Sequence, residues 1–244
     1  MPHGGGMEIV MLFSSAYIMQ KIIMIPIVLI ALTFHELSHG FISSKLGDPT
    51  PRLTGRLTIN PLAHLDPIGA VLMVLTGFGW AKPVQINPRY YKNPKRGMAI
   101  TAAAGPLSNL LMAFIAMLIY TAVIIIGCKT GQFQYKDSSV SYFINSQPDM
   151  LLRIMSFISL FASVNLCFMV FNLIPIPPLD GSRVLGLFLS NSAYFKLQQY
   201  ERYSFILIIV LSLSGVFSRF IGTGVGFFME LLTRMSMAIV GLVV

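Results

Sequence analysis

Apolar runs long enough to cross a lipid bilayer recur along this chain of 244 residues and constrain its fold more than any other feature. A transmembrane helix needs about 20 predominantly apolar residues. Because 55% of the residues are hydrophobic and only 11% are charged, the chain has too little polar surface to cover a water-soluble globule of this size. We therefore predict an all-α membrane protein, a polytopic helical bundle with about five to six transmembrane helices. The apolar runs lie at roughly 9–34, 99–127, 151–174, 203–218 and 220–244, and the last two could form one broken hairpin.

The distribution of basic residues predicts how the chain is oriented in the cell membrane. Eight of the 17 Lys and Arg residues lie between the first two apolar runs, and the positive-inside rule places this loop in the cytoplasm. The segment 128–150 has balanced charges and is expected outside, whereas 182–202 is basic and is expected inside. Since the net charge of +8 lies in short loops, it does not indicate a nucleic-acid partner. The eight basic residues are Lys45, Arg52, Arg56, Lys82, Arg89, Lys92, Lys95 and Arg96.

The stretch 47–94 differs from the apolar runs because it mixes Pro, Gly, Asn and basic residues. Its run Pro67 to Phe78 is too short to span a bilayer and is typical of a re-entrant or interfacial segment. The pieces Leu57 to Ile59 and Pro83 to Ile86 predict a small membrane-associated β-sheet. We divide the chain into a flexible N-terminus (1–8), a catalytic membrane core (9–202) and C-terminal transmembrane helices (203–244).

The motif FHELSHG carries the clearest chemical signal. It places His35 and His39 one helical turn apart on the same face, so that both imidazoles can reach one metal ion. Glu36 projects about 100° around the helix from His35 and can take a proton from a metal-activated water without being a ligand. An ionisable residue inside a membrane span costs about 2.5–3.5 kcal/mol to insert. The motif therefore predicts a catalytic zinc site with Glu36 as the general base.

A zinc ion in a hydrolase usually takes three protein ligands and keeps one position open, so a third ligand is expected. The candidates are Asp180, His64 and Asp66. Asp180 follows FNLIPIPP, where three prolines break a long apolar helix at its cytoplasmic end. His64 and Asp66 lie in the loop NPLAHLDPIG, where a histidine is more often hydrogen-bonded than metal-bound. A supporting or gating role suits His64 better than ligation.

Three motifs give the chain a resemblance to the site-2 proteases, which are intramembrane zinc metalloproteases. They are FHELSHG at 34–40, GPLSN at 105–109 and NLIPIPPLDG at 172–181. The similarity extends over about 22–203 and is closest to compact bacterial and archaeal members without a PDZ domain. It implies that His35, His39 and Asp180 bind Zn²⁺ and that Glu36 is the general base. It further implies that Asn172 holds the substrate or stabilises the oxyanion.

The resemblance implies a zinc metalloendopeptidase that hydrolyses peptide bonds of transmembrane protein or peptide substrates within the lipid bilayer, in regulated intramembrane proteolysis. Two other readings of the same residues are a zinc-binding membrane transporter, which needs no general base, and an inactive membrane adaptor. A homo-oligomer is left open. Asn109 and Asn165 are expected to form hydrogen bonds between helices. Cys128 and Cys167 have no metal-type spacing and predict no disulfide.

Overall fold

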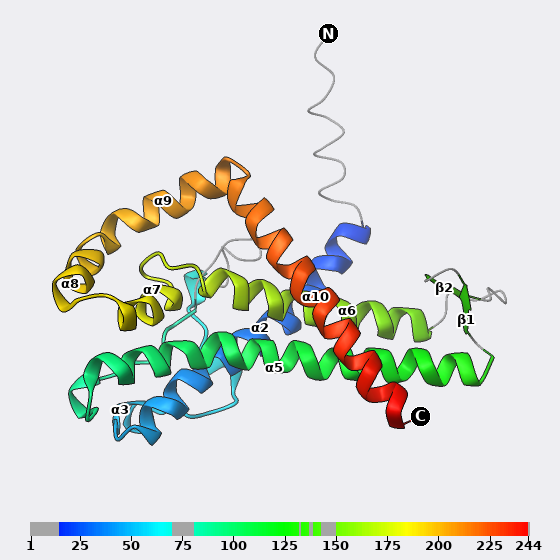
Figure 1. Ribbon diagram of the computed structural model, residues 1–244, viewed down its shortest axis with the longest axis horizontal. Helices are drawn as coiled ribbons and strands as arrows, with labels where there is room; N and C mark the ends of the chain where they lie inside the picture. Colours follow the sequence, from blue (N-terminus) through cyan, green and yellow to red (C-terminus); the bar gives the residue numbers. More distant parts are fainter. Residues whose placement is uncertain (1–14, 70–80, 132, 137–138, 143–149, 244) are drawn as a thin grey trace, which may run out of the picture. The chain divides into compact units, whose positions relative to one another are not determined.

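The computed structural model describes residues 15–69, 81–131, 133–136, 139–142 and 150–243, which form a chain dominated by α-helices (Figure 1). The chain divides into two compact units after residue 92. The first unit contains α2 (Ser15–Lys45), α3 (Thr50–Leu53) and the short 3₁₀ helices η1 (Pro61–Ala63) and η2 (Pro88–Tyr90). The second contains α5 (Pro94–Lys129), β1 (Phe133–Lys136), β2 (Ser139–Tyr142), α6 (Met150–Asn172), α7 (Asp180–Leu185), η3 (Gly186–Phe188), α8 (Asn191–Gln199), α9 (Glu201–Leu213) and α10 (Val216–Val243).

Four helices in the described part of the chain are long and apolar enough to cross a membrane, which confirms the predicted class of fold. They are α2 from Ile22, α5, α6 and α10. The predicted run at 203–218 instead forms α9, whose 13 residues extend about 20 Å and fall short of the roughly 30 Å hydrocarbon core. Gly215 separates α9 from α10 with a φ of 74°, a left-handed conformation that favours glycine. The last two apolar runs thus correspond to α9 and α10, which are separated at Gly215.

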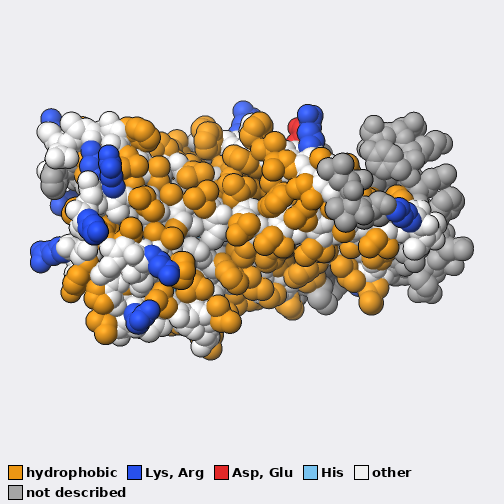
Figure 2. Space-filling model, turned by 60° about the horizontal axis from the view of Figure 1, so that its bottom comes forward, with side chains coloured by type: hydrophobic (Ala, Val, Ile, Leu, Met, Phe, Trp, Pro, Cys, Tyr) orange, Lys and Arg blue, Asp and Glu red, His pale blue; other side chains and the backbone are white. Residues whose placement is uncertain are grey.

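Helix α5 shows how these helices divide their surface between protein and lipid. Leu107, Leu111, Ile115 and Ile119 recur every four residues and are all exposed. The other side of α5 is buried and rich in alanine and glycine. One face of the molecule in Figure 2 is accordingly covered largely by hydrophobic side chains. An exposed apolar stripe of this kind is suited to contact lipid tails rather than water.

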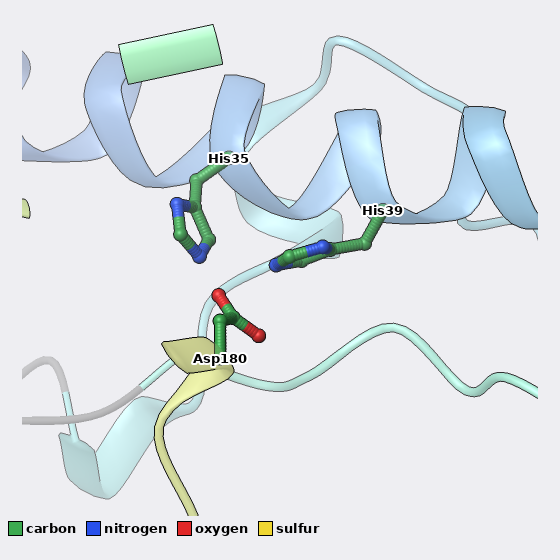
Figure 3. Close-up of side chains that lie close together, drawn as sticks. All are labelled: His35, His39 and Asp180. Carbon is green, nitrogen blue, oxygen red and sulfur yellow. The ribbon is translucent and has the colours of Figure 1, made fainter. Parts of the chain in front are cut away.

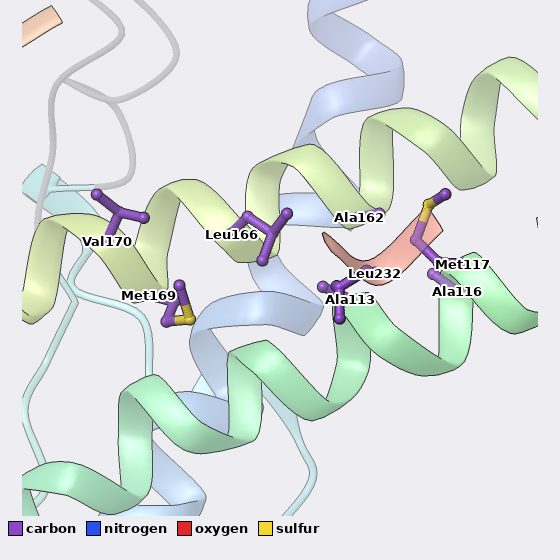
Figure 4. Close-up of a cluster of buried hydrophobic side chains, with 8 residues drawn as sticks. All are labelled: Ala113, Ala116, Met117, Ala162, Leu166, Met169, Val170 and Leu232. Atoms are coloured by element: carbon purple, nitrogen blue, oxygen red, sulfur yellow. The ribbon is translucent and has the colours of Figure 1, made fainter. Parts of the chain in front are cut away.

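The core of the second unit lies where α5, α6 and α10 pack together, as Figure 1 shows. Small residues on α5 and α6 let the helices approach closely, as expected for packing within a membrane. Figure 4 shows the buried cluster, which consists of Ala113, Ala116, Met117, Ala162, Leu166, Met169, Val170 and Leu232.

Two buried hydrogen bonds connect the same helices. The amide Nδ2 of Asn109 donates to Oδ1 of Asn165 over 2.9 Å, which confirms the predicted bond between helices. The hydroxyl oxygens of Thr121 and Ser236 lie 2.7 Å apart, although the residues are 115 positions apart in sequence. Each polar group thereby finds a partner at a depth where lipid offers none.

The small sheet expected within 47–94 is not found among the described residues of that stretch. Only an isolated bridge joins Leu65 to Ala81, and the one hairpin in the described chain, β1–β2, lies at 133–142. In this stretch, side chains form hydrogen bonds with backbone groups that a sheet would have paired with one another. The ring nitrogen Nε2 of His64 lies 2.9 Å from the carbonyl of Thr58, and the N–H of Val84 donates to a carboxylate. Most of the proposed re-entrant run lies at 70–80, outside the described residues.

Candidate metal centre

Helix α2 carries His35 and His39 in its last third, and both side chains are buried. Their ring centroids are 4.6 Å apart and the rings are nearly perpendicular, as expected for side chains one turn apart on one face. Gly40 follows directly, and a Cβ there would come within 3.0 Å of the Leu57 side chain. The absence of a side chain at Gly40 therefore lets the loop pack close to the histidine turn.

Glu36 is held by the loop at 81–91. Its Oε2 accepts a hydrogen bond from the backbone N–H of Val84 over 2.9 Å, and the side chain is half-buried. This bond fixes the direction of the carboxylate while one oxygen remains for other contacts. The sequence pointed to Glu36 but not to Val84, because a backbone donor 48 residues away leaves no pattern in the sequence.

A buried carboxylate, Asp48, anchors the same loop three residues beyond Val84. One Asp48 oxygen, Oδ2, accepts from the hydroxyl of Ser43 (2.7 Å) and from the N–H of Asn87 (2.8 Å). The other, Oδ1, accepts from the N–H of Thr50 (2.9 Å). Burial alone would raise the pKa of Asp48, but these hydrogen bonds outweigh it and lower the pKa below its usual value. Sequence reasoning missed this residue because a Gly-Asp-Pro sequence after a helix resembles an ordinary turn.

Asp180 is the first residue of α7 and is buried. Helix α6 ends at Asn172, and a turn of seven residues rich in proline leads to α7, as the sequence indicated. Ile174 and Leu179 of this turn pack with Phe217 in a small core cluster. Gly181 fixes the position of the turn, because a Cβ there would lie only 2.2 Å from the carbonyl oxygen of Leu173.

His35, His39 and Asp180 form a group that could hold a metal ion. One ligand atom from each residue lies within 4.8 Å of the others, and it is the only such group of three in the described part of the chain. Figure 3 shows the two rings projecting from α2 and the carboxylate at the start of α7. Two imidazoles and one carboxylate are a donor set typical of catalytic zinc, which leaves a fourth position open.

The other predicted site residues have different surroundings. Nδ2 of Asn172 donates to the carbonyl of Phe168 in its own helix over 3.0 Å. His64 is buried, and Oδ1 of Asp66 accepts from the N–H of Gly69 over 2.9 Å. Neither His64 nor Asp66 belongs to the metal group within the described chain.

Four helices able to span a membrane and a buried group of metal-binding side chains define a membrane protein with a candidate metal centre. A family model described as "Peptidase family M50" matches residues 23–215, and the chain belongs to this family. The membership confirms the resemblance to site-2 proteases and shows a membrane metallopeptidase.

Two relatives agree with this assignment. "Putative zinc metalloprotease YwhC" of Bacillus subtilis is 35% identical over 189 residues, which cover 75% of this chain and 76% of the relative. "Putative zinc metalloprotease Rip2" of Mycolicibacterium smegmatis is 24% identical over 196 residues, which cover 78% of this chain and 66% of the relative. Zinc, the predicted cofactor, agrees with both names and with the donor set. No solved structure gives a significant match.

We expect Gly181→Ala to destabilise the protein by more than about 3 kcal/mol, because the new Cβ would overlap backbone atoms that cannot move independently. Gly40→Ala is the matched comparison: its Cβ meets side-chain rather than backbone atoms, none nearer than 3.0 Å, and a gain in helix propensity of about 1 kcal/mol offsets the tight contact. Thermal unfolding in detergent measures both variants. Equal stability of the two variants would contradict the close backbone approach at Gly181.

We expect Asp48→Asn to cost about 1.5–3 kcal/mol of unfolding free energy at neutral pH, the usual contribution of hydrogen bonds to a charged group. Because the pKa of Asp48 is depressed below its usual 3.8 in the folded protein, this stabilisation is complete above that value and is lost as the pH falls through the folded pKa.

Unfolding temperatures of the wild type and Asp48→Asn should therefore differ by a constant amount from about pH 5 to 7 and converge below about pH 3.8. Asp66→Asn serves as the control, since Asp66 is half-buried and accepts a hydrogen bond from Gly69. A difference for Asp48→Asn that grew on acidification would contradict the depressed pKa.

Proposed function

We propose that this protein is an intramembrane zinc metalloprotease in which His35, His39 and Asp180 hold the zinc ion and Glu36 is the general base. The observation that carries the proposal is the metal group itself. Its members come from two motifs about 140 residues apart, and all three are buried. Residues 9–202 would form the catalytic core, and 203–244 would form a C-terminal membrane segment in which α10 is long enough to span the membrane.

Zinc bound by these residues would lower the pKa of a water in its open position toward about 7. Glu36 would take the proton of that water and deliver it to the departing amine of the cleaved peptide bond. The N–H of Val84 supports this role because it fixes the carboxylate of Glu36. A base that must exchange protons within a confined site benefits from such orientation.

Asn172 is proposed to hold the substrate or stabilise the oxyanion. One N–H of its amide is used by the carbonyl of Phe168, and an amide group carries two. The second N–H can donate to a developing oxyanion, an interaction worth several kcal/mol in hydrolases. The position of Asn172 at the end of α6, directly before the turn that leads to Asp180, supports this role.

The proposed substrates are transmembrane segments, cleaved in regulated intramembrane proteolysis. His35 and His39 lie in a helix apolar enough to span a membrane, which supports a site that membrane-embedded substrates can reach. A helical substrate must unwind locally before attack, since its peptide groups are hydrogen-bonded within the helix.

Glu36→Gln tests the proposed mechanism. We expect cleavage of a transmembrane substrate in detergent to fall by at least about 100-fold, because general-base catalysis is lost, while the zinc content stays at the wild-type level. Glu201→Gln is the matched control, since Glu201 is exposed at the start of α9 and should retain full activity.

Persistent cleavage by Glu36→Gln would contradict the proposed role of Glu36. Zinc transport into liposomes by the wild type without cleavage of any substrate would instead favour a transporter. The two assays therefore separate the main alternatives.

We further propose that the active site opens toward the cytoplasm, as the distribution of basic residues predicts. Lys92→Cys and Lys129→Cys, each in a variant without Cys128 and Cys167, place one exposed thiol near either end of α5. A membrane-impermeant maleimide should label Lys129→Cys on intact cells, and Lys92→Cys only after lysis. The reverse pattern would contradict the proposed orientation.

A further inference from the structure

Helix α10 carries charged side chains on the face that points away from its own bundle. It packs on α5 and α6 through one side, where Leu232 belongs to the core cluster and Ser236 contacts Thr121. Its opposite side is exposed and carries polar or small residues at intervals of three or four. This polar face consists of Arg219, Thr223, Gly226, Glu230 and Arg234.

The centre of the polar face lies at the middle of the predicted membrane. Leu232 shares the core cluster with Ala113 and Ala162, which lie near the midpoints of α5 and α6. Glu230 and Arg234 flank Leu232 in sequence and therefore lie at a similar depth. Their side chains are 65% and 77% exposed, which would place them against lipid tails in an isolated molecule.

Such exposure is costly and needs an explanation. A charged side chain at the centre of a transmembrane helix costs about 2.5–3.5 kcal/mol on insertion scales, and such residues almost always face protein or a water-filled cavity. Glu230 and Arg234 pair with each other over 2.5 Å. That pair reduces the cost, but the guanidinium of Arg234 carries five N–H donors and its side chain remains 77% exposed. Another protein surface that covers this face would remove the cost.

We propose that the polar face of α10 is a dimer interface and that its partner is a second copy of this chain. The face carries both signs of charge one turn apart, so it is complementary to itself. A two-fold axis along the membrane normal keeps both copies in the same orientation and makes the two helices parallel. Equal positions of the two copies then lie at the same depth, and Glu230 of each copy lies one turn, about 6 Å along the axis, from the other copy's Arg234. These long side chains can bridge that offset, so that two diagonal ion pairs form across the axis.

The small residues of α10 support close approach of the two helices. A Cβ at Gly222 or at Gly226 would meet nothing within 4 Å, so the surface there is open. The two glycines are four residues apart, which is the small-xxx-small spacing that lets transmembrane helices pack closely. Gly226 lies one turn before Glu230 on the same face, so close packing would bring the charges of the two copies within reach of each other.

Cysteine cross-linking in native membranes tests which face meets the partner. Thr223→Cys and Ile239→Cys, each without Cys128 and Cys167, are a matched pair, because both positions are exposed but their side chains point about 160° apart around the helix. Thr223 lies on the polar face and should form a disulfide-linked dimer under mild oxidation, whereas Ile239 should not. Absence of the Thr223→Cys dimer, or its replacement by a cross-link to a different protein, would overturn the proposal.

Charge exchange tests the proposed ion pairs. A dimer of Glu230→Arg carries only positive charges at positions 230 and 234, and a dimer of Arg234→Glu carries only negative charges there. Each variant should therefore reduce co-purification of two differently tagged copies by at least about 10-fold. When the two variants are expressed together, a mixed dimer can form. Its Arg at position 230 can pair with the partner's Glu at position 234, and the partner's Glu230 can pair with Arg234. Co-purification should therefore recover.

Recovery separates contacts between copies from contacts within one helix, because mixing does not repair the intrahelical pair of either variant. Failure to recover, while the wild type co-purifies, would overturn the assignment of this interface. If a charge variant does not accumulate in the membrane, the cross-linking pair decides, since it retains both charges. Neither experiment depends on proteolytic activity, so both outcomes are independent of the proposed function.

Discussion

This structure depends on one constraint: every polar group at membrane depth must find a hydrogen-bond partner or an ion. Asn109 meets it through Asn165, and Thr121 meets it through Ser236. Two buried histidines and a buried aspartate on apolar helices and turns are harder to satisfy, because they carry lone pairs or charge. The three residues form a group that could hold a metal ion, and a bound cation would satisfy all three at once.

Helix α2 carries His35, Glu36 and His39, and irregular segments supply further contacts that fix parts of the proposed site. The loop 81–91 orients Glu36 through the N–H of Val84, and Asp48 holds this loop by accepting the N–H of Asn87. The turn before α7 depends on Gly181, whose missing side chain allows contact with Leu173. The long helices therefore supply a frame, and short segments with buried hydrogen bonds orient individual side chains of the proposed site on it.

The sequence was sufficient for features with a local period or composition. Apolar runs identified the long helices, the spacing of His35 and His39 identified a metal-binding turn, and three prolines marked the end of α6. Contacts between distant segments of irregular backbone have no such signal, so neither the Asp48 network nor the Val84 bond could be predicted. The prediction of a sheet at 57–86 was wrong for the same reason. The residue types indicated strands, but side chains form hydrogen bonds with backbone groups of Thr58 and Val84. The residues alone favoured Asp180 among three candidate ligands, because it follows the prolines that break a long apolar helix, and the family resemblance implied the same residue.

The zinc content of purified variants tests the central claim most directly. We expect the wild type to retain about one zinc ion per chain, and Asp180→Ala to lose most of it because only two imidazoles remain. His64→Ala, which removes another buried polar side chain, should retain the metal. Full zinc occupancy in Asp180→Ala would contradict a centre built from His35, His39 and Asp180.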